Sequence, residues 1–411
     1  MAALAACTPG SPPEPFSLEF VEVPLAAAAG AALPHLAVHE TTAVLSWVEP
    51  ASEGHQLRFA SWVQGSWSTA ATVSSGPGWF VNWADFPAVV PVDRQTWVAH
   101  WLVRSGDAPY AYDVALSTSL DGGTTWTAAA SPHRDGTKTE HGFVTAAPSP
   151  SGPVVVWLDG RHTAGSGSHD DHAGPSTASS AAMALAATTL DTHGQPAPEA
   201  LIDMAVCDCC QTDAALTDEG LIVVYRNRDP QSEERDIAAV RYTPSGWSEP
   251  VPVHQDGWVI RGCPVNGPAV DARDARVAVA WFTAAGGTPR VRVAFSEDAG
   301  RRLMTPIEVD SREPLGRVDV ALLPDGSALV SWLARSSAGA LLRVARVRPE
   351  GALEGPWDVA GSSGARSAGF PQMVRLDESL LIAWTEDGNP SRLVTVAASL
   401  APQWLDGSSG R

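Results

Sequence analysis

The side chains with the clearest chemical potential in this chain are four cysteines in two short segments. Cys207, Cys209 and Cys210 lie almost side by side, and Cys263 follows in a separate segment. Thiolates are soft ligands that suit Cu(I) and Zn(II), so the group predicts a copper or zinc site. The alternative is a disulfide between Cys263 and one of the other three, with the remaining two paired or free. A bond between the adjacent Cys209 and Cys210 would be strained.

Histidines extend this candidate ligand set. His141 precedes one of the expected strands, and three more stand in a long polar loop: His162, His169 and His172. Imidazole binds both copper and zinc. The loop also fits a solvated insertion, and His141 alone also fits a structural role.

The other charged candidates suit anion binding or acid–base chemistry. Guanidinium groups bind carboxylates in a forked geometry, and a pair of carboxyl groups can hydrolyse glycosides. The arginines are Arg226, Arg261 and Arg317, and the carboxylates are Asp85, Glu140, Asp208 and Asp319.

These residues belong to a chain with a regular repeat. A short apolar run that ends in an aromatic residue recurs seven times, at residues 43–47, 97–101, 154–157, 221–225, 277–281, 328–332 and 380–384. The interval of about fifty residues indicates a radial repeat. Each unit contains four short alternating runs with turn residues between them, which is typical of an antiparallel propeller blade. The chain is therefore predicted to be an all-β, seven-bladed propeller, with six blades as the alternative.

The N-terminal segment is expected to close the ring. Residues 16–23 form an unassigned strand, and the last unit has only three strands, so pairing the two removes an exposed edge. In a propeller, the loops that enter each first strand meet at one face around the axis. We therefore expect the four cysteines to gather at the axial mouth, with the loop at residues 162–172 on the same face.

One turn resembles a known family motif. Ser119-Leu-Asp-Gly-Gly-Thr-Thr-Trp126 matches the Asp-box of the sialidase-like, BNR-repeat propellers, and residues 296–303 resemble a decayed copy. The resemblance implies that Ser119, Asp121, Gly123 and Trp126 form a structural turn between the third and fourth strands. A further resemblance is to exported bacterial sialidase-like proteins that carry Cys-Asp-Cys-Cys-Gln-Thr, and it implies export and fold but no particular reaction.

The catalytic residues of sialidases do not carry over. That family binds the substrate carboxylate with three arginines, the first in a motif near the N-terminus, and here the first blade reads Leu33-Pro-His-Leu-Ala-Val38. Arg226, Arg261, Arg317 and Asp208 remain the catalytic candidates, and classical exo-α-sialidase activity is not expected.

The first residues predict a cellular address. Leu4-Ala-Ala-Cys7 resembles the lipobox of bacterial lipoproteins, which implies lipidation of Cys7; an ordinary tail with a free cysteine is the alternative. We therefore divide the chain into a signal remnant and tether (1–15), the propeller (16–400) and a polar, loop-like tail (401–411). The expected location is the bacterial cell envelope, as a periplasmic or outer-membrane lipoprotein.

Composition limits the partners. The formal net charge of −19 argues against nucleic acid and against anionic membrane surfaces, because phosphate binding needs a basic face. Membrane contact is expected only through the lipid anchor, and no nucleotide cofactor is expected. The partner is a small molecule, a glycan or a protein at the axial mouth. Three hypotheses follow: copper or zinc binding or chemistry, an exo-glycosidase with a rearranged site, and a non-catalytic interaction scaffold.

Overall fold

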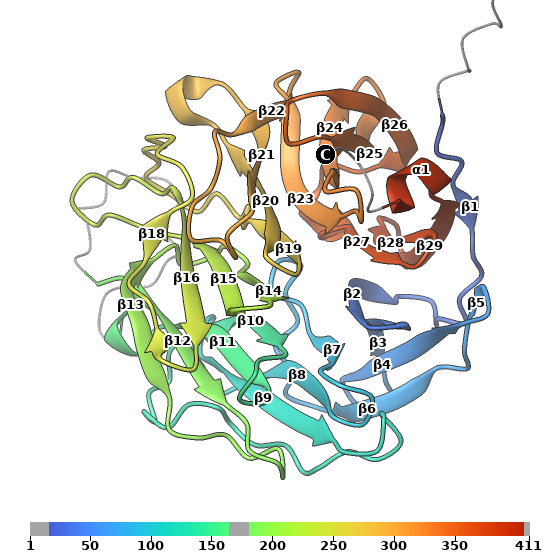
Figure 1. Cartoon of the computed structure of the whole chain (residues 1–411). Helices are drawn as coiled ribbons and strands as arrows, with labels where there is room; N and C mark the ends of the chain where they lie inside the picture. Colours follow the sequence, from blue (N-terminus) through green and yellow to red (C-terminus); the bar gives the residue numbers. More distant parts are fainter. Residues whose placement is uncertain (1–15, 164–180, 407–411) are drawn as a thin grey trace, which may run out of the picture.

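Seven antiparallel sheets surround a central axis in the computed structural model, which describes residues 16–163 and 181–406 (Figure 1). This confirms the seven-bladed propeller, and the six-bladed alternative is wrong. The described helices are α1 (Pro402–Leu405) and the 3-10 turns η1 (Arg161–Thr163), η2 (Ala285–Gly287) and η3 (Arg366–Ala368). Within the described residues, no helix has the length and apolar character needed to cross a membrane.

The strands follow the chain blade by blade. The first blade contains β2 (Ala32–His39), β3 (Thr42–Pro50), β4 (His55–Val63), β5 (Ser66–Trp67) and β6 (Ala71–Gly76), and the second contains β7 (Ala88–Pro91), β8 (Trp97–Arg104) and β9 (Tyr112–Ser119). The third blade contains β10 (His141–Ala147), β11 (Val154–Asp159), β12 (Met183–Thr189) and β13 (Ala200–Val206). The fourth blade contains β14 (Asp213–Thr217), β15 (Gly220–Arg226), β16 (Ile237–Thr243), β17 (Gly246–Trp247) and β18 (Val251–Pro252). The fifth blade contains β19 (Ala269–Arg273), β20 (Arg276–Thr283), β21 (Arg290–Ser296) and β22 (Ile307–Asp310). The sixth contains β23 (Pro314–Leu322), β24 (Ala328–Ser336), β25 (Gly339–Val347) and β26 (Leu353–Ser362). The seventh contains β27 (Gln372–Leu376), β28 (Ser379–Glu386), β29 (Arg392–Ser399) and the N-terminal strand β1 (Val21–Glu22).

The repeated aromatic phrases are the second strands of the seven blades, as predicted. Their tryptophans pack in the core, and Trp47, Trp157, Trp281 and Trp332 are almost completely buried. A buried indole N–H needs an acceptor, and here a carboxylate supplies it. For example, Trp157 Nε1 donates to Asp159 Oδ2 at 2.9 Å. The same pairing of the phrase's aromatic residue with a carboxylate occurs for Trp47, Tyr225, Trp281 and Trp332.

The N-terminal strand closes the ring. β1 pairs antiparallel with β29, with Val21 opposite Ala397 and Glu22 opposite Val396, which confirms the predicted partner. The preceding residues help, because Leu18 is buried in the core of the last two blades. Phe16 packs edge-on against Trp404 with ring centroids 4.7 Å apart.

The C-terminal segment differs from the loop that the sequence suggests. Residues 402–405 form the short helix α1, and Trp404 within it is buried in the same core as Leu18. The guanidinium of Arg346 lies 4.9 Å from the centre of the Trp404 ring. One buried aromatic side chain therefore extends the folded propeller past residue 400, where composition alone indicated a polar tail.

The second blade has three strands, although a fourth strand at Trp126 was expected. The Asp-box segment forms a tight turn directly after β9. Ser119 Oγ accepts the Gly123 N–H at 2.8 Å, and Asp121 Oδ1 accepts the Thr125 N–H at 2.8 Å. Trp126 then packs against Phe59 of the first blade, with ring centroids 6.0 Å apart. This structural role is the one that the family resemblance implies.

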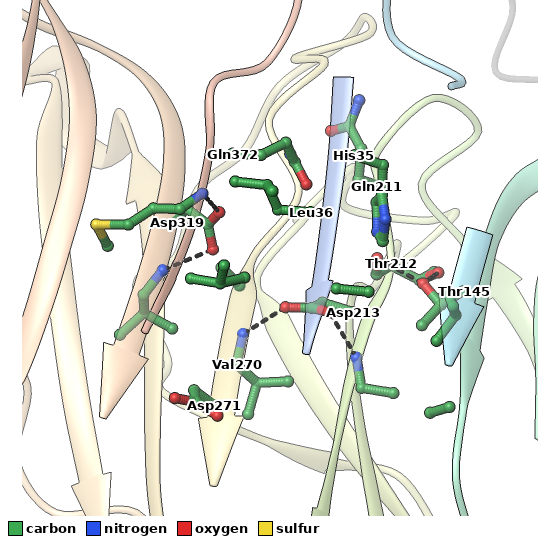
Figure 2. Close-up of a pocket in the computed structure, with 18 of the residues that line it drawn as sticks. His35, Leu36, Thr145, Gln211, Thr212, Asp213, Val270, Asp271, Asp319 and Gln372 are labelled. Carbon is green, nitrogen blue, oxygen red and sulfur yellow. Dashed lines mark hydrogen bonds between the residues drawn. The ribbon is translucent and has the colours of Figure 1, made fainter. Parts of the chain in front are cut away.

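Buried aspartates link neighbouring blades along the axis. Asp213 Oδ2 accepts the Val270 N–H of the next blade at 2.7 Å (Figure 2). The same contact recurs from Asp271 to the Leu322 N–H at 2.7 Å and from Asp319 to the Met373 N–H at 2.6 Å. Burial raises the pKa of Asp213 to about 7 and that of Asp319 well above its usual value.

These raised pKa values predict a pH dependence of stability. Because Asp213 holds its proton more tightly in the folded chain, its contribution to stability is full below the unfolded pKa and is lost as pH rises through about 7. Each such proton changes the free energy of unfolding by up to about 1.4 kcal/mol per pH unit. Urea unfolding from pH 5 to 8 should therefore show a shallower decline for Asp213→Asn than for the unchanged chain. The exposed control Asp191→Asn should keep the original slope; a parallel curve for Asp213→Asn would contradict the assignment.

Candidate functional site

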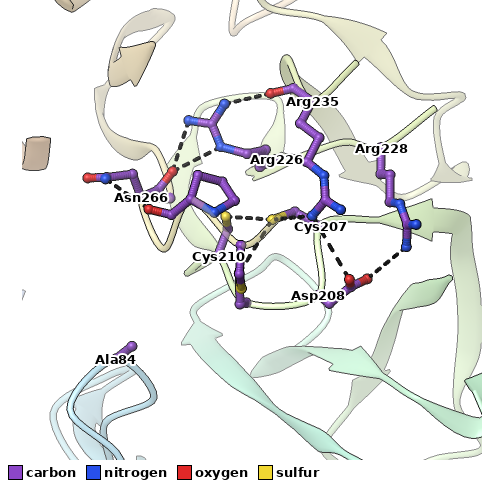
Figure 3. The surroundings of a disulfide bond; sticks show 12 residues. Ala84, Cys207, Asp208, Cys210, Arg226, Arg228, Arg235 and Asn266 are labelled. Carbon is purple, nitrogen blue, oxygen red and sulfur yellow. Dashed lines mark hydrogen bonds and ion pairs between the residues drawn. A yellow bond between two sulfur atoms is a disulfide. The ribbon is translucent and has the colours of Figure 1, made fainter. Parts of the chain in front are cut away.

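The four cysteines of interest cluster between the third, fourth and fifth blades. Cys207, Cys209 and Cys210 lie on the loop between β13 and β14, and Cys263 lies on the loop before β19. Cys209 and Cys263 form a disulfide with their Cα atoms 6.0 Å apart. Cys207 Sγ lies 2.6 Å from Cys210 Sγ and 3.9 Å from Cys209 Sγ (Figure 3). The predicted clustering of the sulfurs is therefore found, with Cys263 joined to one of the trio.

Arginines shape the electrostatics of the two free thiols. Cys207 and Cys210 are both buried, and Arg235 Nη1 lies 3.5 Å from Cys207 Sγ. Burial alone would raise the pKa of Cys207, but the hydrogen bond from Cys210 and the charge of Arg235 outweigh it and lower that pKa to about 7. Burial raises the pKa of Cys210 well above its usual value. One sulfur of the pair is thus suited to be a thiolate near neutral pH and the other a thiol.

A compact ion-pair network surrounds these thiols. Asp208 Oδ1 lies 3.4 Å from Arg228 Nη1, and Arg228 Nη2 lies 2.8 Å from Glu233 Oε1. Arg235 Nη2 lies 3.2 Å from the same glutamate, at Oε2. These side chains are all largely buried, so each partner offsets the cost of burying the other. Asp208 therefore serves here as the anionic partner of arginines beside the cysteines.

The arginines proposed to bind a substrate carboxylate have other partners. Arg226 is 1% exposed and donates to the main-chain oxygens of Arg235, Asn266 and Phe282. Arg317 donates to the oxygens of Gly369 and Ala365, and burial lowers its pKa to about 10. Arg261 is exposed on the loop that leads to Cys263. In the described residues, Arg226 and Arg317 thus hold loops and strands together.

The candidate histidines do not join the cysteines as one ligand set. His141 is completely buried, and it lies beside His133 and Asp113 in a group separate from the sulfurs. His162 is exposed in η1. His169 and His172 lie outside the described residues. No regular residue spacing pointed to the His141 group, because its members come from separate segments that run from β9 to the end of β11.

An axial cavity of about 510 Å³ lies at the centre of the ring, and its described lining includes Gln211 and Thr212 but none of the four cysteines. The inner strands of the blades line it, and five carboxylates contribute to its wall: Glu40, Asp85, Asp213, Asp271 and Asp319. At one end, Gln211 Nε2 donates to the Ala84 oxygen at 2.6 Å, and Gln211 Oε1 accepts the Gly267 N–H at 3.1 Å. Gln211 therefore ties the loop of Cys210 to two other blades. Of these carboxylates, Glu40, Asp213 and Asp271 were missed, although an aspartate recurs in the first strands of three consecutive blades.

Tyr112 joins two of the predicted carboxylates. Its hydroxyl oxygen lies 3.0 Å from Asp85 Oδ2 and 2.6 Å from Glu140 Oε1. Burial raises the pKa of Asp85 to about 7 and that of Glu140 to about 8. Tyr112 itself is completely buried and its ring stacks on Phe80. Burial and the two neighbouring carboxyl groups raise the pKa of Tyr112 well above its usual value, so its hydroxyl keeps its proton, and only Asp85 and Glu140 can exchange protons near neutral pH.

Comparison with known proteins gives the fold. No family model and no curated protein matches the chain. Among solved structures, a protein of unknown function from Dyadobacter fermentans matches with a TM-score of 0.51 and 15% identity, over 93% of this chain and 98% of the other. The endosialidase of phage phi92 matches with a TM-score of 0.51 and 9% identity, over 94% of this chain and 70% of the other. A puromycin hydrolase matches with a TM-score of 0.50 and 13% identity, over 90% of this chain but only 52% of the hydrolase. At these identities the likeness extends to the architecture alone, which is a β-propeller like that of the phage endosialidase.

Proposed function

We propose that this propeller binds a soft metal ion, copper or zinc, through the cysteines between its third, fourth and fifth blades. The observation that supports it is the convergence of sulfurs, since Cys207, Cys209 and Cys210 each place a ligand atom within 4.8 Å of the others. Cys263 adds a fourth sulfur through its bond to Cys209. Four thiolates are a common ligand set for structural zinc, and thiolates also select Cu(I).

The spacing of the sulfurs supports a tetrahedral site in the reduced chain. A Zn–S bond of about 2.3 Å requires sulfurs about 3.8 Å apart, and the 3.9 Å between Cys207 and Cys209 is close to that value. Binding needs a two-electron reduction of the Cys209–Cys263 disulfide, which an external dithiol would supply in the cell envelope, and an increase of the Cys207–Cys210 sulfur separation from 2.6 Å to about 3.8 Å. The positive charges of Arg235 and Arg226 near Cys207 favour the thiolate that a metal requires.

The first test is metal content after anaerobic, reducing purification. We expect about one copper or zinc ion per unchanged chain, and a fall towards background for Cys263→Ser and Cys207→Ser. A chain expressed without lipidation keeps the Cys7 thiol, and in that chain Cys7→Ser is the matched control for the loss of one cysteine; it should leave metal content unchanged. Folding of each variant is checked by circular dichroism, since blade packing supplies most of the core. Background metal in the reduced, unchanged chain would overturn the proposal.

Thiol–disulfide exchange is the second candidate, and the positions of the sulfurs favour it specifically. Cys207 Sγ lies 3.9 Å from the Cys209 sulfur of the Cys209–Cys263 disulfide, and its lowered pKa favours the attacking thiolate. The attack would form a Cys207–Cys209 bond and release Cys263 as the thiolate.

If the cysteines only form disulfides, Cys263→Ser should lower the free energy of unfolding of the oxidised chain by about 2–4 kcal/mol and leave metal content at background. The same variants therefore separate metal binding from a cross-linking role.

The proposal places this site in the bacterial cell envelope, with the chain anchored by a lipid on Cys7. The support is the Leu4-Ala-Ala-Cys7 segment, which lies outside the described residues. When the complete gene is expressed in its host, we expect mass spectrometry of the mature N-terminus to find Cys7 first and lipidated. A protein that keeps an unmodified segment before Cys7 would refute the anchor, and Cys7→Ser should release the chain from the membrane fraction.

Classical sialidase activity is expected to be absent. Arg226 and Arg317 use their donors on main-chain oxygens, so neither is free to bind a sialic acid carboxylate. Each missing charge-assisted pair removes about 1.5–3 kcal/mol of binding. The assay is release of a fluorescent aglycone from a sialoside, with an active sialidase as the positive control. Turnover comparable to that control would promote an exo-glycosidase, and the Asp85–Tyr112–Glu140 group would then be the first target for substitution.

We also propose that a ligand binds at the axial mouth. The cavity of about 510 Å³ is large enough for a small molecule or the end of a glycan, and its rim offers Gln211 and Gln372 beside the carboxylates. A protein bound at the same face, with the propeller acting as a scaffold, would use the loops around the mouth instead.

A further inference from the structure

A second group of metal-ligating side chains lies between the second and third blades, apart from the cysteines. Asp113 stands near the start of β9, His133 and Asp135 lie on the connection from β9 to β10, and His141 begins β10. Asp159 ends β11. The fold thus brings two histidines and three carboxylates together from four segments, and none of them is engaged by the cysteine site.

The two imidazole rings are stacked, with carboxylates at both edges. The ring centroids are 3.9 Å apart and the planes differ by 6°. At one edge, Asp113 Oδ1 lies 3.4 Å from His141 Nδ1 and 3.9 Å from His133 Nε2. At the other edge, Asp135 Oδ2 lies 3.2 Å from His141 Nε2 and 3.3 Å from His133 Nδ1. Asp159 Oδ1 is 3.7 Å from the same nitrogen of His141.

The edge at Asp113 has unpartnered polar atoms. Within the described residues, Asp113 Oδ1, His133 Nε2 and His141 Nδ1 at this edge are buried and have no hydrogen-bond partner, and the same holds for Asp135 Oδ2 and His141 Nε2 at the opposite edge. His141 is completely buried and His133 is 7% exposed. Buried polar groups are nearly always satisfied, because leaving one unpaired costs free energy. The three atoms at the Asp113 edge face one another, so a single cation can contact all of them.

The opposite edge already has its cation. Arg161 Nη2 lies 2.7 Å from Asp159 Oδ2 and 3.6 Å from Asp135 Oδ2. No arginine or lysine of the described residues is paired with Asp113. The Asp113 edge is therefore the one whose unpartnered atoms have no guanidinium beside them.

We propose that Asp113, His133 and His141 bind a divalent transition-metal ion of the zinc class through Asp113 Oδ1, His133 Nε2 and His141 Nδ1. Metal–nitrogen and metal–oxygen bonds of about 2.0–2.2 Å place neighbouring ligand atoms about 3.4 Å apart. The 3.4 Å separation of Asp113 Oδ1 from His141 Nδ1 matches that spacing, and the 3.9 Å separation from His133 Nε2 must shorten by about 0.5 Å. Because the rings are stacked with planes 6° apart, their lone pairs are nearly parallel, so at least one imidazole must rotate out of the stack before both nitrogens point at one ion.

Asp135 and Asp159 are the positioning residues of this site. Each lies at the ring nitrogen that does not face Asp113, which is where metal-bound histidines place a carboxylate acceptor. The side chain of Asp113 is 31% exposed although its Oδ1 is buried, which places the open side of the site at this carboxylate. Three protein ligands leave a fourth position, which a water molecule or a small oxygen ligand can occupy.

The test uses the full chain in its oxidised form, with accessible thiols alkylated, and Co²⁺ and Zn²⁺ as probes. We expect one Co²⁺ per chain with a visible spectrum of nitrogen and oxygen ligands and no thiolate charge-transfer band. Asp113→Asn should weaken binding by roughly 100-fold or more, since even the loss of an outer partner costs roughly 10- to 100-fold. Zn²⁺ should raise the melting temperature of the unchanged chain and not that of the variant.

Asp107→Asn is the matched control, because Asp107 is an exposed aspartate of the same blade. It should bind both ions like the unchanged chain. His133→Ala supplies a second variant, and it should also lose Co²⁺ while Cys207→Ser retains it. Absence of Co²⁺ binding by the unchanged chain, or equal binding by Asp113→Asn, would overturn the proposal. A thiolate band lost in Cys207→Ser would assign the ion to the cysteine site instead.

Discussion

Closure of the ring is the constraint on which the other features of this propeller depend. The pairing of Val21–Glu22 with β29 joins the two ends of the chain and leaves each inner strand at a fixed position around the axis. Once the blades are fixed, the loops before β14 and β19 are neighbours, although Cys209 and Cys263 are 54 residues apart in sequence. Phe16, Leu18 and Trp404 reinforce the closure from both ends, since they pack in or against the same apolar core. The geometry of the cysteine site therefore depends on the ring that the pairing of β1 with β29 closes.

The repeat made the fold predictable, because each of the seven blades must bury a large side chain on its second strand. A second strand must bury a large side chain between neighbouring blades, so aromatic residues such as Trp157 and Trp281 return at a regular interval. The clustering of cysteines was predictable for a related reason: loops that enter first strands emerge at one face, whatever their sequence. Trp404 shows the limit of this approach, because a single buried aromatic residue in a polar segment carries no periodic signal.

The roles of the arginines and of His141 could not be read from the sequence. Arg226 could bind either a substrate anion or main-chain carbonyls, and only the position of Asn266 and Phe282 around it decides for the carbonyls. His141 was grouped with the cysteines because both stand in entering loops. Its actual neighbours, His133 and Asp113, come from the preceding blade and its connection, and their meeting depends on the twist and offset of two sheets.

The two clusters also differ in local charge, although the chain as a whole carries −19. Around Cys207 the arginines 226, 228 and 235 gather, which stabilises thiolates and suits a soft ion. Around His141 three aspartates gather against the single charge of Arg161, which suits a harder divalent ion. Glu140 stands between them: it precedes His141, and burial together with the charges of Asp85 and Asp208 raises its pKa to about 8. With its pKa at about 8, Glu140 is largely protonated at neutral pH, so the carboxyl that precedes His141 adds little to the negative charge of the three aspartates.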